Sequence, residues 1–256
     1  MEVSYSSGEC IVLVNSLSLP CQFPVNSFKI MHYEETADAL DEYVLRHIDP
    51  EPEVLHRVQR LTHIRLTYTR MCSGHLQGRL LKMLCQLAQA HCILELGTFS
   101  GYSALSMAEA LTPDPTTGRE ALHTIEVFDE LEDFIRENMA SAGTIGEKVH
   151  LHLGDALDLI PEVSRQMGQP WDVCFIDADK RHYLEYYEAV LPYVRSGGMI
   201  LADNTLWDGK VLDPEPKESD LQTRGLQRFN DFVASDTRVE KVILPMRDGL
   251  TLIRKK

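Results

Sequence analysis

The chain has 256 residues, of which 44% are hydrophobic and 25% are charged, close to the globular average, so disorder and fibrous repeats are excluded. Its 25 Lys and Arg against 39 Asp and Glu give a formal net charge of −14, which argues against a general binder of nucleic acid or anionic membranes but leaves a local basic patch open. The longest apolar runs are too short to span a bilayer, and no basic segment precedes the apolar residues 11–14 as a secretory signal would require, so we expect a cytoplasmic protein.

Residues 1–30 differ from the rest of the chain. They hold one Lys and no Arg, and they show neither a helical nor a strand-like alternation. We therefore hypothesise that residues 1–30 are an extension outside the folded unit, which begins near Met31 and runs to residue 256 as a single domain. The alternative is an N-terminal arm that packs on a partner subunit. Three helices are expected next, over Thr36–His47, from about Val54 to Leu66, and over Gly78–Ala90.

After Ala90, strand-like and helical segments alternate. The expected strands are Cys92–Leu96, His123–Val127, Val149–Leu153, Val173–Ile176 and Met199–Ala202, and the helices between and after them are Tyr102–Leu111, Leu131–Ala142, Ala156–Met167, Tyr183–Val194 and Leu221–Ser235. Such alternation predicts a parallel sheet with helices on both faces. Two final strands, Val239–Leu244 and Gly249–Arg254, flank a hairpin signal. The prediction is an α/β, Rossmann-like, seven-stranded, mostly parallel sheet with an antiparallel C-terminal hairpin and extra N-terminal helices, an arrangement similar to that of class I S-adenosylmethionine-dependent methyltransferases.

A glycine loop follows the first strand of the parallel sheet. Gly97 and Gly101 permit a tight turn from strand to helix, where open α/β sheets bind their ligands. Phe99 stands where a dinucleotide fingerprint needs glycine, so a nucleoside without a pyrophosphate fits this loop better. Glu126 ends the second strand and is expected to accept the ribose hydroxyls. Asp155 and Ala156 end the third strand, where they either contact an adenine edge or cap a helix.

Polar side chains end the next two strands. Asp177 follows one of them, and Asp203 and Asn204 follow its predicted neighbour. Two carboxylates and an amide oxygen form a hard ligand set that suits Mg²⁺ better than zinc. The plainer alternative is a group of loop residues that cap helices. Because three such groups end adjacent strands beside Lys180, we favour the metal site.

Four segments carry a resemblance to a known family: Gly97–Ser103, Asp177–Lys180, Asp203–Asn204 and Asp248–Gly249. The chain resembles the caffeoyl-CoA and catechol O-methyltransferase family in these segments, and the likeness runs from about Thr36 to the C-terminus. The resemblance implies that Asp177, Asp203 and Asn204 hold a divalent cation, most readily Mg²⁺, with Mn²⁺ or Ca²⁺ as alternatives. It implies cofactor contacts at Met71, Ser73, Glu95, Gly97, Ser103, Glu126, Ala156 and Asp179; Thr98, Asp155 and Asp177 are further candidates. Lys180 matches the general base of the catechol branch. Trp207 is similar to an aromatic residue of the acceptor pocket, or is a packed loop residue.

Three functions remain open. The leading one is an S-adenosylmethionine- and cation-dependent O-methyltransferase acting on a small vicinal-dihydroxy aromatic, catechol-like or caffeoyl-like, as a homodimer without membrane or nucleic-acid partners. A second is methylation of a hydroxylated tRNA uridine, for which Arg57, Arg60, Arg65 and Arg70 offer a basic helix face although the net charge weighs against it. A third is a non-catalytic cofactor-binding module, which the set of Asp177, Lys180, Asp203 and Asn204 disfavours.

Overall fold

The computed structural model describes residues 2–6, 9–13 and 33–256, and it divides into a unit that ends at His47 and a unit from Ile48 to Lys256. In the first unit, β1 (Glu2–Ser6) pairs antiparallel with β2 (Glu9–Leu13), and α1 spans Tyr33–His47. These two strands were not predicted, since residues 1–30 show no strand-like alternation and the backbone groups that make the pairing leave little trace in composition. The proposed start at Met31 lies outside the described residues and stays a hypothesis.

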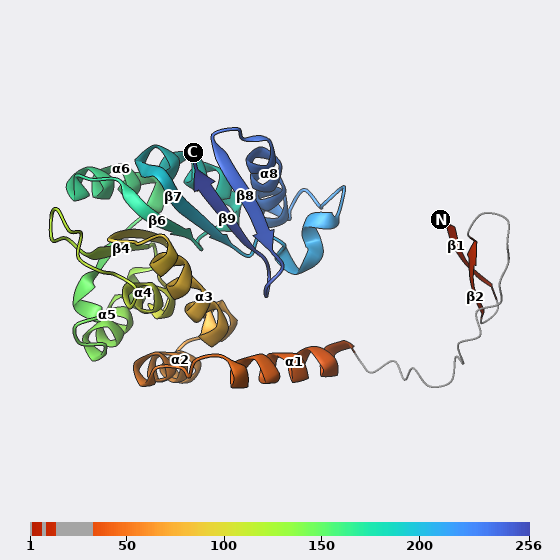
Figure 1. Cartoon of the computed structure of the whole chain (residues 1–256), viewed down its shortest axis with the longest axis horizontal. Helices are drawn as coiled ribbons and strands as arrows, with labels where there is room; N and C mark the ends of the chain where they lie inside the picture. Colours follow the sequence, from red (N-terminus) through yellow and green to blue (C-terminus); the bar gives the residue numbers. More distant parts are fainter. Residues whose placement is uncertain (1, 7–8, 14–32) are drawn as a thin grey trace. The chain divides into compact units, whose positions relative to one another are not determined.

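The second unit is built on a seven-stranded sheet with the order β5-β4-β3-β6-β7-β9-β8 (Figure 1). The strands are β3 (Cys92–Leu96), β4 (Ala121–Glu126), β5 (Val149–Leu153), β6 (Trp171–Ile176), β7 (Val194–Asp203), β8 (Val239–Leu244) and β9 (Leu250–Lys255). β3 to β7 run parallel, whereas β9 lies antiparallel between β7 and β8. The expected sheet and its C-terminal hairpin are thus confirmed. Because β3 pairs with both β4 and β6, the strand order reverses there, which is where such sheets bind ligands.

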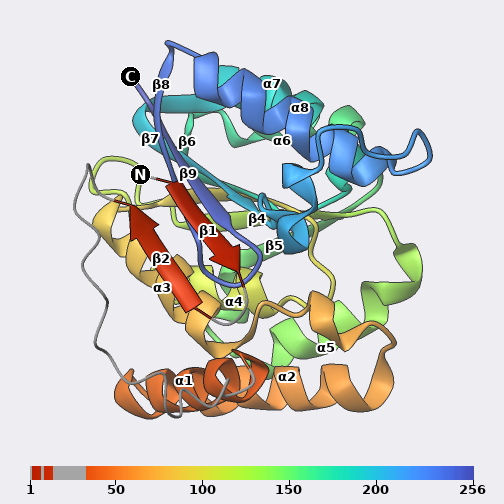
Figure 2. The same cartoon turned by 90° about the vertical axis from the view of Figure 1, so that its right-hand side faces the viewer.

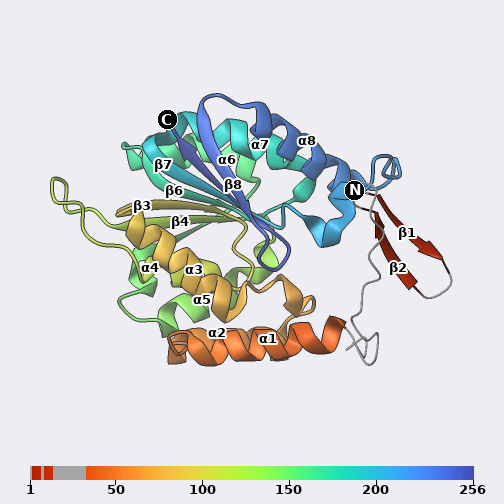
Figure 3. The ribbon, with the colours of Figure 1, turned by 45° about the vertical axis from the view of Figure 1, so that its right-hand side comes forward.

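Helices cover both faces of the sheet, as Figures 2 and 3 show. They are α2 (Glu53–Arg65), α3 (Gly74–Leu87), α4 (Tyr102–Ala108), α5 (Glu132–Ser141), α6 (Ala156–Met167), α7 (Tyr183–Val190) and α8 (Leu221–Ser235). One core cluster joins α6, α7 and α8 to Leu94 of β3, and the other joins α2 to α5 to Ile93. Adjacent residues of β3 therefore bury opposite faces, which explains its unbroken apolar sequence. No helix in the described part of the chain is long and apolar enough to cross a membrane.

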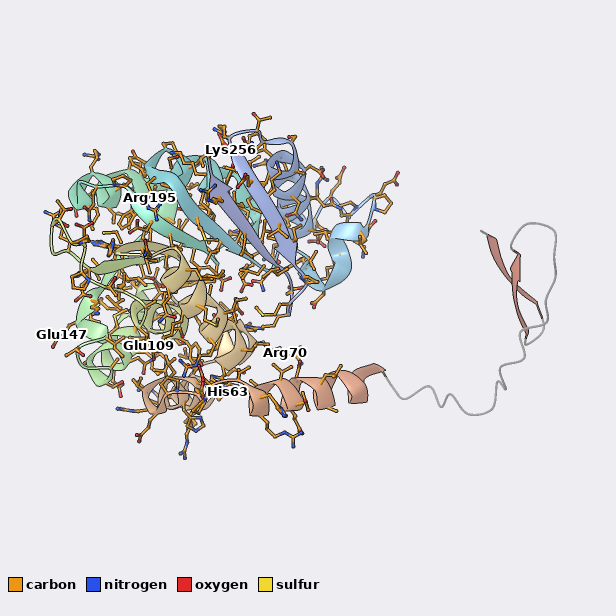
Figure 4. The ribbon with its side chains drawn as sticks, in the orientation of Figure 1. His63, Arg70, Glu109, Glu147, Arg195 and Lys256 are labelled. Atoms are coloured by element: carbon orange, nitrogen blue, oxygen red, sulfur yellow. The ribbon has the colours of Figure 1, made fainter. Side chains whose placement is uncertain are left out.

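An ion pair fixes the amino ends of three strands. Asp172 of β6 accepts hydrogen bonds from the backbone N–H groups of His91 (2.8 Å) and Cys92 (2.9 Å) at the start of β3. Its other oxygen lies 2.6 Å from Nε of Arg195 on β7, a residue labelled in Figure 4. The buried carboxylate of Asp172 thus holds β3, β6 and β7 in register. This register in turn sets where their carboxyl ends lie.

Three histidines meet on β4 and β5, and they make the fold sensitive to acid. His123 Nδ1 lies 2.8 Å from His152 Nε2, and the His123 and His150 rings are 4.8 Å apart between centroids. Burial, with the charges of His150 and His152 when protonated, lowers the pKa of His123 to about 4, below the ordinary 6.5. As the pH falls, His123 therefore takes up a proton at a higher pH in the unfolded chain than in the folded chain. The stability present above pH 6.5 is lost as the pH falls from about 6.5 toward 4.

We expect His123→Gln to reduce this loss of stability, because glutamine carries no charge across that pH range. The measurement is the free energy of unfolding in urea at several pH values between 7.5 and 4.5. His63→Gln, an exposed position on α2 labelled in Figure 4, is the control and should keep the wild-type pH dependence. Equal pH dependence in wild type and His123→Gln would contradict the assignment.

Candidate active site

The glycine loop after β3 lies directly against the end of β6. Gly97 has a φ of 90°, and a Cβ atom there would be 2.1 Å from the carbonyl oxygen of Asp177. The backbone N–H of Asp177 donates to the carbonyl of Leu96 at 2.9 Å, which keeps the two strand ends together. Glycine is therefore required at position 97 for the close approach of two backbones as well as for the turn.

Gly97→Ala is expected to lower the free energy of unfolding by more than about 3 kcal/mol, because it adds a clash with backbone to the unfavourable φ. Gly118→Ala is the matched control, since Gly118 also has a positive φ of 70° but has no atom within 4 Å of the added Cβ. That variant should cost only about 1–2 kcal/mol. Urea unfolding of both proteins decides, and equal losses would show that the contact with Asp177 contributes nothing.

Glu126 holds the glycine loop through its carboxylate. One oxygen accepts from the backbone N–H groups of Thr98 (3.1 Å) and Phe99 (2.8 Å), and the other from those of Val127 (2.9 Å) and Phe128 (3.0 Å). A carboxylate has about four acceptor positions, so a ribose hydroxyl would have to share one of them. This loop-holding role of Glu126 was not predicted from the sequence, and the expected ribose contact stays a prediction.

Beneath the loop lies a buried carboxyl group, Glu95. It is fully buried and accepts hydrogen bonds from the hydroxyls of Ser103 (2.6 Å) and Thr124 (2.5 Å). Burial raises the pKa of Glu95 to about 8, and the two hydrogen bonds oppose this rise only in part. Thr98 joins the same network, with its hydroxyl 2.5 Å from that of Thr124. The structure thus brings together three of the expected cofactor residues, Glu95, Thr98 and Ser103.

Other expected cofactor residues have local structural roles. Asp155 caps α6 by accepting from the N–H of Leu157 at 2.8 Å, which is the capping alternative considered for it. Asp179 accepts from the backbone N–H of Arg181 at 3.0 Å, and the Arg181 guanidinium lowers the pKa of this carboxyl. Ser73 and Ala156 are buried at the starts of α3 and α6, whereas Met71 is exposed. Their cofactor contacts stay predictions.

The acidic residues meet at the ends of β6 and β7. The register pairs Ile176 with Ala202, so Asp177 and Asp203 are the next residues on adjacent strands. Burial, together with the charge of Asp177, raises the pKa of Asp203 to about 6, although Gln77 donates to Asp203 Oδ2 at 2.7 Å. Asn204 follows with a φ of 56°, so the chain turns sharply there.

Lys180 lies beside this pair, in the turn between β6 and α7. Its Nζ is 2.8 Å from Oδ1 of Asp177 and 5.3 Å from the ring centroid of Tyr183. Burial alone would lower the pKa of Lys180, but the interactions with Asp177 and Tyr183 outweigh it and raise the pKa above its ordinary value. In this arrangement Lys180 is an ammonium group paired with Asp177.

Trp207 lies in the segment between β7 and α8. It is half-buried and packs against the core cluster of α6, α7 and α8. Its indole Nε1 is buried and has no hydrogen-bond partner among the described residues, and Lys210 Nζ lies 5.6 Å from its ring centroid. The next residue, Asp208, donates its backbone N–H to Asp248 of the β8–β9 loop. A contact of Trp207 with an acceptor stays a prediction.

Three features define a Rossmann-like methyltransferase fold of class I. They are the order of the strands, the antiparallel final strand and the glycine loop at the point where the strand order reverses. A family model described as O-methyltransferase matches residues 46–256. The chain belongs to this O-methyltransferase family.

Several known proteins are similar to the chain. A catechol O-methyltransferase of Niastella koreensis is 41% identical over 69% of this chain and 78% of its own length. Caffeoyl-CoA O-methyltransferase 2 of Zea mays is 33% identical over 86% of this chain and 83% of its own length. Among solved structures, the O-methyltransferase TomG from Streptomyces achromogenes, in complex with S-adenosylmethionine, matches with a TM-score of 0.79 and 31% identity over 88% of this chain and all of that one. The chain is thus an O-methyltransferase of the caffeoyl-CoA and catechol type.

Proposed function

We propose that the chain transfers the methyl group of S-adenosylmethionine to one hydroxyl of a small vicinal-dihydroxy aromatic, with the help of a divalent cation. The observation that carries the proposal is the meeting of Asp177, Lys180 and Asp203 at adjacent strand ends, next to the Gly97 loop. The relatives support the acceptor class, because one is a catechol O-methyltransferase. The cofactor is supported by TomG, which was solved in complex with S-adenosylmethionine, and by a Bacillus cereus O-methyltransferase solved with SAH (29% identity over 87% of this chain and 99% of that one, TM-score 0.76).

The donor chemistry of the acidic residues fits a hard cation. No group of three or more His, Cys, Asp or Glu side chains suited to a metal occurs among the described residues, and the proposed set instead joins two carboxylates to the amide of Asn204. Oxygen ligands of this kind suit Mg²⁺, with Mn²⁺ or Ca²⁺ as alternatives. A bound cation would lower the pKa of an acceptor hydroxyl, which for a free phenol is about 10.

The residues of the chain supply position and proton transfer. Glu126 and Glu95 keep the glycine loop in one conformation, so that the methyl donor and the acceptor oxygen can be held in line. Lys180 would receive the acceptor proton at Nζ in its neutral amine form. A cation held by Asp177 would favour that form, because the carboxylate would then no longer stabilise the ammonium group. Trp207, which follows Asn204 closely in the chain, would pack against the aromatic acceptor.

We further propose that the enzyme is a cytoplasmic homodimer. Large apolar side chains at the end of α2 and just after it support a subunit contact, since Ile64 is 67% and Tyr68 is 80% exposed. Light scattering coupled to gel filtration measures the mass directly. A monomer at micromolar concentration would contradict the homodimer.

The test of the proposed reaction compares acceptors. Purified protein with S-adenosylmethionine and Mg²⁺ is expected to methylate catechol and caffeoyl compounds, with one methyl group added per product by mass spectrometry. Bulk tRNA, the acceptor in the alternative function, should gain none. Methyl transfer to tRNA but not to catechols would favour the alternative, and binding of the cofactor without transfer to any acceptor would favour a non-catalytic module.

A further inference from the structure

Gln77 of α3 links the C-terminal hairpin to a proposed cation ligand. Its side chain is 1% exposed, and its Nε2 donates to Oδ2 of Asp203 at 2.7 Å. Its Oε1 accepts a hydrogen bond from Nη1 of Arg247, which lies in the loop between β8 and β9. A single buried amide therefore joins a cationic side chain on one side to a carboxylate on the other.

The orientation of this amide is fixed by its two partners. The guanidinium of Arg247 has only donors, so it must face the amide oxygen, and the carboxylate of Asp203 is then met by the NH₂ group. Turning the Gln77 amide over would set donors against donors at Arg247 and oxygen against oxygen at Asp203. Gln77 consequently donates to Oδ2 of Asp203 in a fixed direction and makes no bond to the other carboxylate oxygen.

Arg247 is itself held firmly. It donates to the backbone carbonyls of Ser73 and Cys72 in the turn before α3, and its φ of 50° places it in the left-handed region. The same loop is tied to the turn after β7, since the N–H of Thr205 donates to Gly249 (3.1 Å) and that of Leu206 donates to Asp248 (2.9 Å). The hairpin loop thus contacts both the segment before α3 and the segment that carries Asn204.

We infer that Gln77 and Arg247 are positioning residues for the proposed cation site: Arg247 orients the Gln77 amide, and Gln77 orients Asp203. The inference rests on the proposed function, because it assumes that Asp203 binds a cation. It assigns to the β8–β9 loop a role in cation affinity, although no residue of that loop is a proposed ligand. Hydrogen-bond partners of ligating carboxylates commonly change metal affinity by about 10- to 100-fold.

The test is calorimetric titration of the whole chain with Mn²⁺. Gln77→Ala is expected to weaken Mn²⁺ binding about 10- to 100-fold while the affinity for S-adenosylmethionine changes less than about twofold. Gln77→Met, which fills the volume without a donor, should behave alike and covers the case in which the alanine variant is unstable. Gln86→Ala, an exposed position on the same helix, is the control and should bind as wild type does.

The relation between the two residues is tested by a double variant. If Arg247 acts through Gln77, Arg247→Ala weakens Mn²⁺ binding in the wild type but causes no further loss in Gln77→Ala. Arg254→Ala, on the same hairpin and paired with Glu240 at its surface, should have no effect. Wild-type Mn²⁺ affinity in both Gln77 variants, or additive losses in the double variant, would overturn the inference alone. A wild-type chain that binds no Mn²⁺ would contradict the proposed function as well.

Discussion

Replacing Lys180 with alanine is expected to lower kcat for a catechol acceptor by about 10²- to 10⁴-fold, the range of a lost general base. Lys180 Nζ lies 2.8 Å from Asp177, at the strand ends where the acceptor hydroxyl is proposed to bind. Lys180 takes no part in the hydrogen bonds among Glu95, Ser103 and Thr124, so cofactor binding is predicted to survive. The measurement is steady-state turnover together with the dissociation constant of S-adenosylmethionine by calorimetry.

Two further variants separate proton transfer from charge. Lys180→Arg keeps a cation beside Asp177 but removes a group that can lose its proton, so its kcat should fall nearly as far as that of Lys180→Ala. Lys217→Ala, at an exposed position in the segment before α8, should retain wild-type turnover. If Lys180→Arg retained full activity, the residue would act by its charge and not as a base.

Much of this fold was predictable because its causes are local. The buried parallel strands appear as short apolar runs, and the β8–β9 hairpin appears as two strand patterns around Asp248 and Gly249. The limits of elements were less predictable. The helix expected from Gly78 begins at Gly74, and the strand expected over Met199–Ala202 begins at Val194, because contacts with the rest of the fold extend both elements.

The candidate site was predictable only where its residues follow strands. Asp177 and Asp203 end adjacent strands, so topology alone brings them together. Gln77 gave no such signal, since it lies on a helix 126 residues from Asp203 in the chain and 170 from Arg247. Contacts of this kind depend on the packing of α3 against the sheet, which hydrophobic pattern does not specify to the level of one amide.

Removal of divalent cations is expected to abolish turnover. Chain treated with EDTA and then freed of it should lose at least about 10²-fold in kcat, because the acceptor hydroxyl would keep its ordinary pKa of about 10 and Asp177 and Asp203 would face each other without a cation. Added Mg²⁺ should restore the rate. The affinity for S-adenosylmethionine, measured in parallel, should change little, since Glu126 holds the loop through the N–H groups of Thr98 and Phe99 and not through the side chain of a proposed ligand.

Ligand variants show whether the effect arises at the proposed site. Asp177→Ala and Asp203→Ala should depress turnover as EDTA does, and added Mg²⁺ should not rescue them. Asp213→Ala, an exposed acid in the segment between β7 and α8, should respond to EDTA and Mg²⁺ as wild type does. Such results would assign the cation dependence to the two carboxylates at adjacent strand ends. The chain has a net charge of −14, and an acidic residue elsewhere on it would then have no effect on the response to cations. Unchanged turnover after chelation would remove the cation from the mechanism and leave Lys180 to act alone on the acceptor hydroxyl.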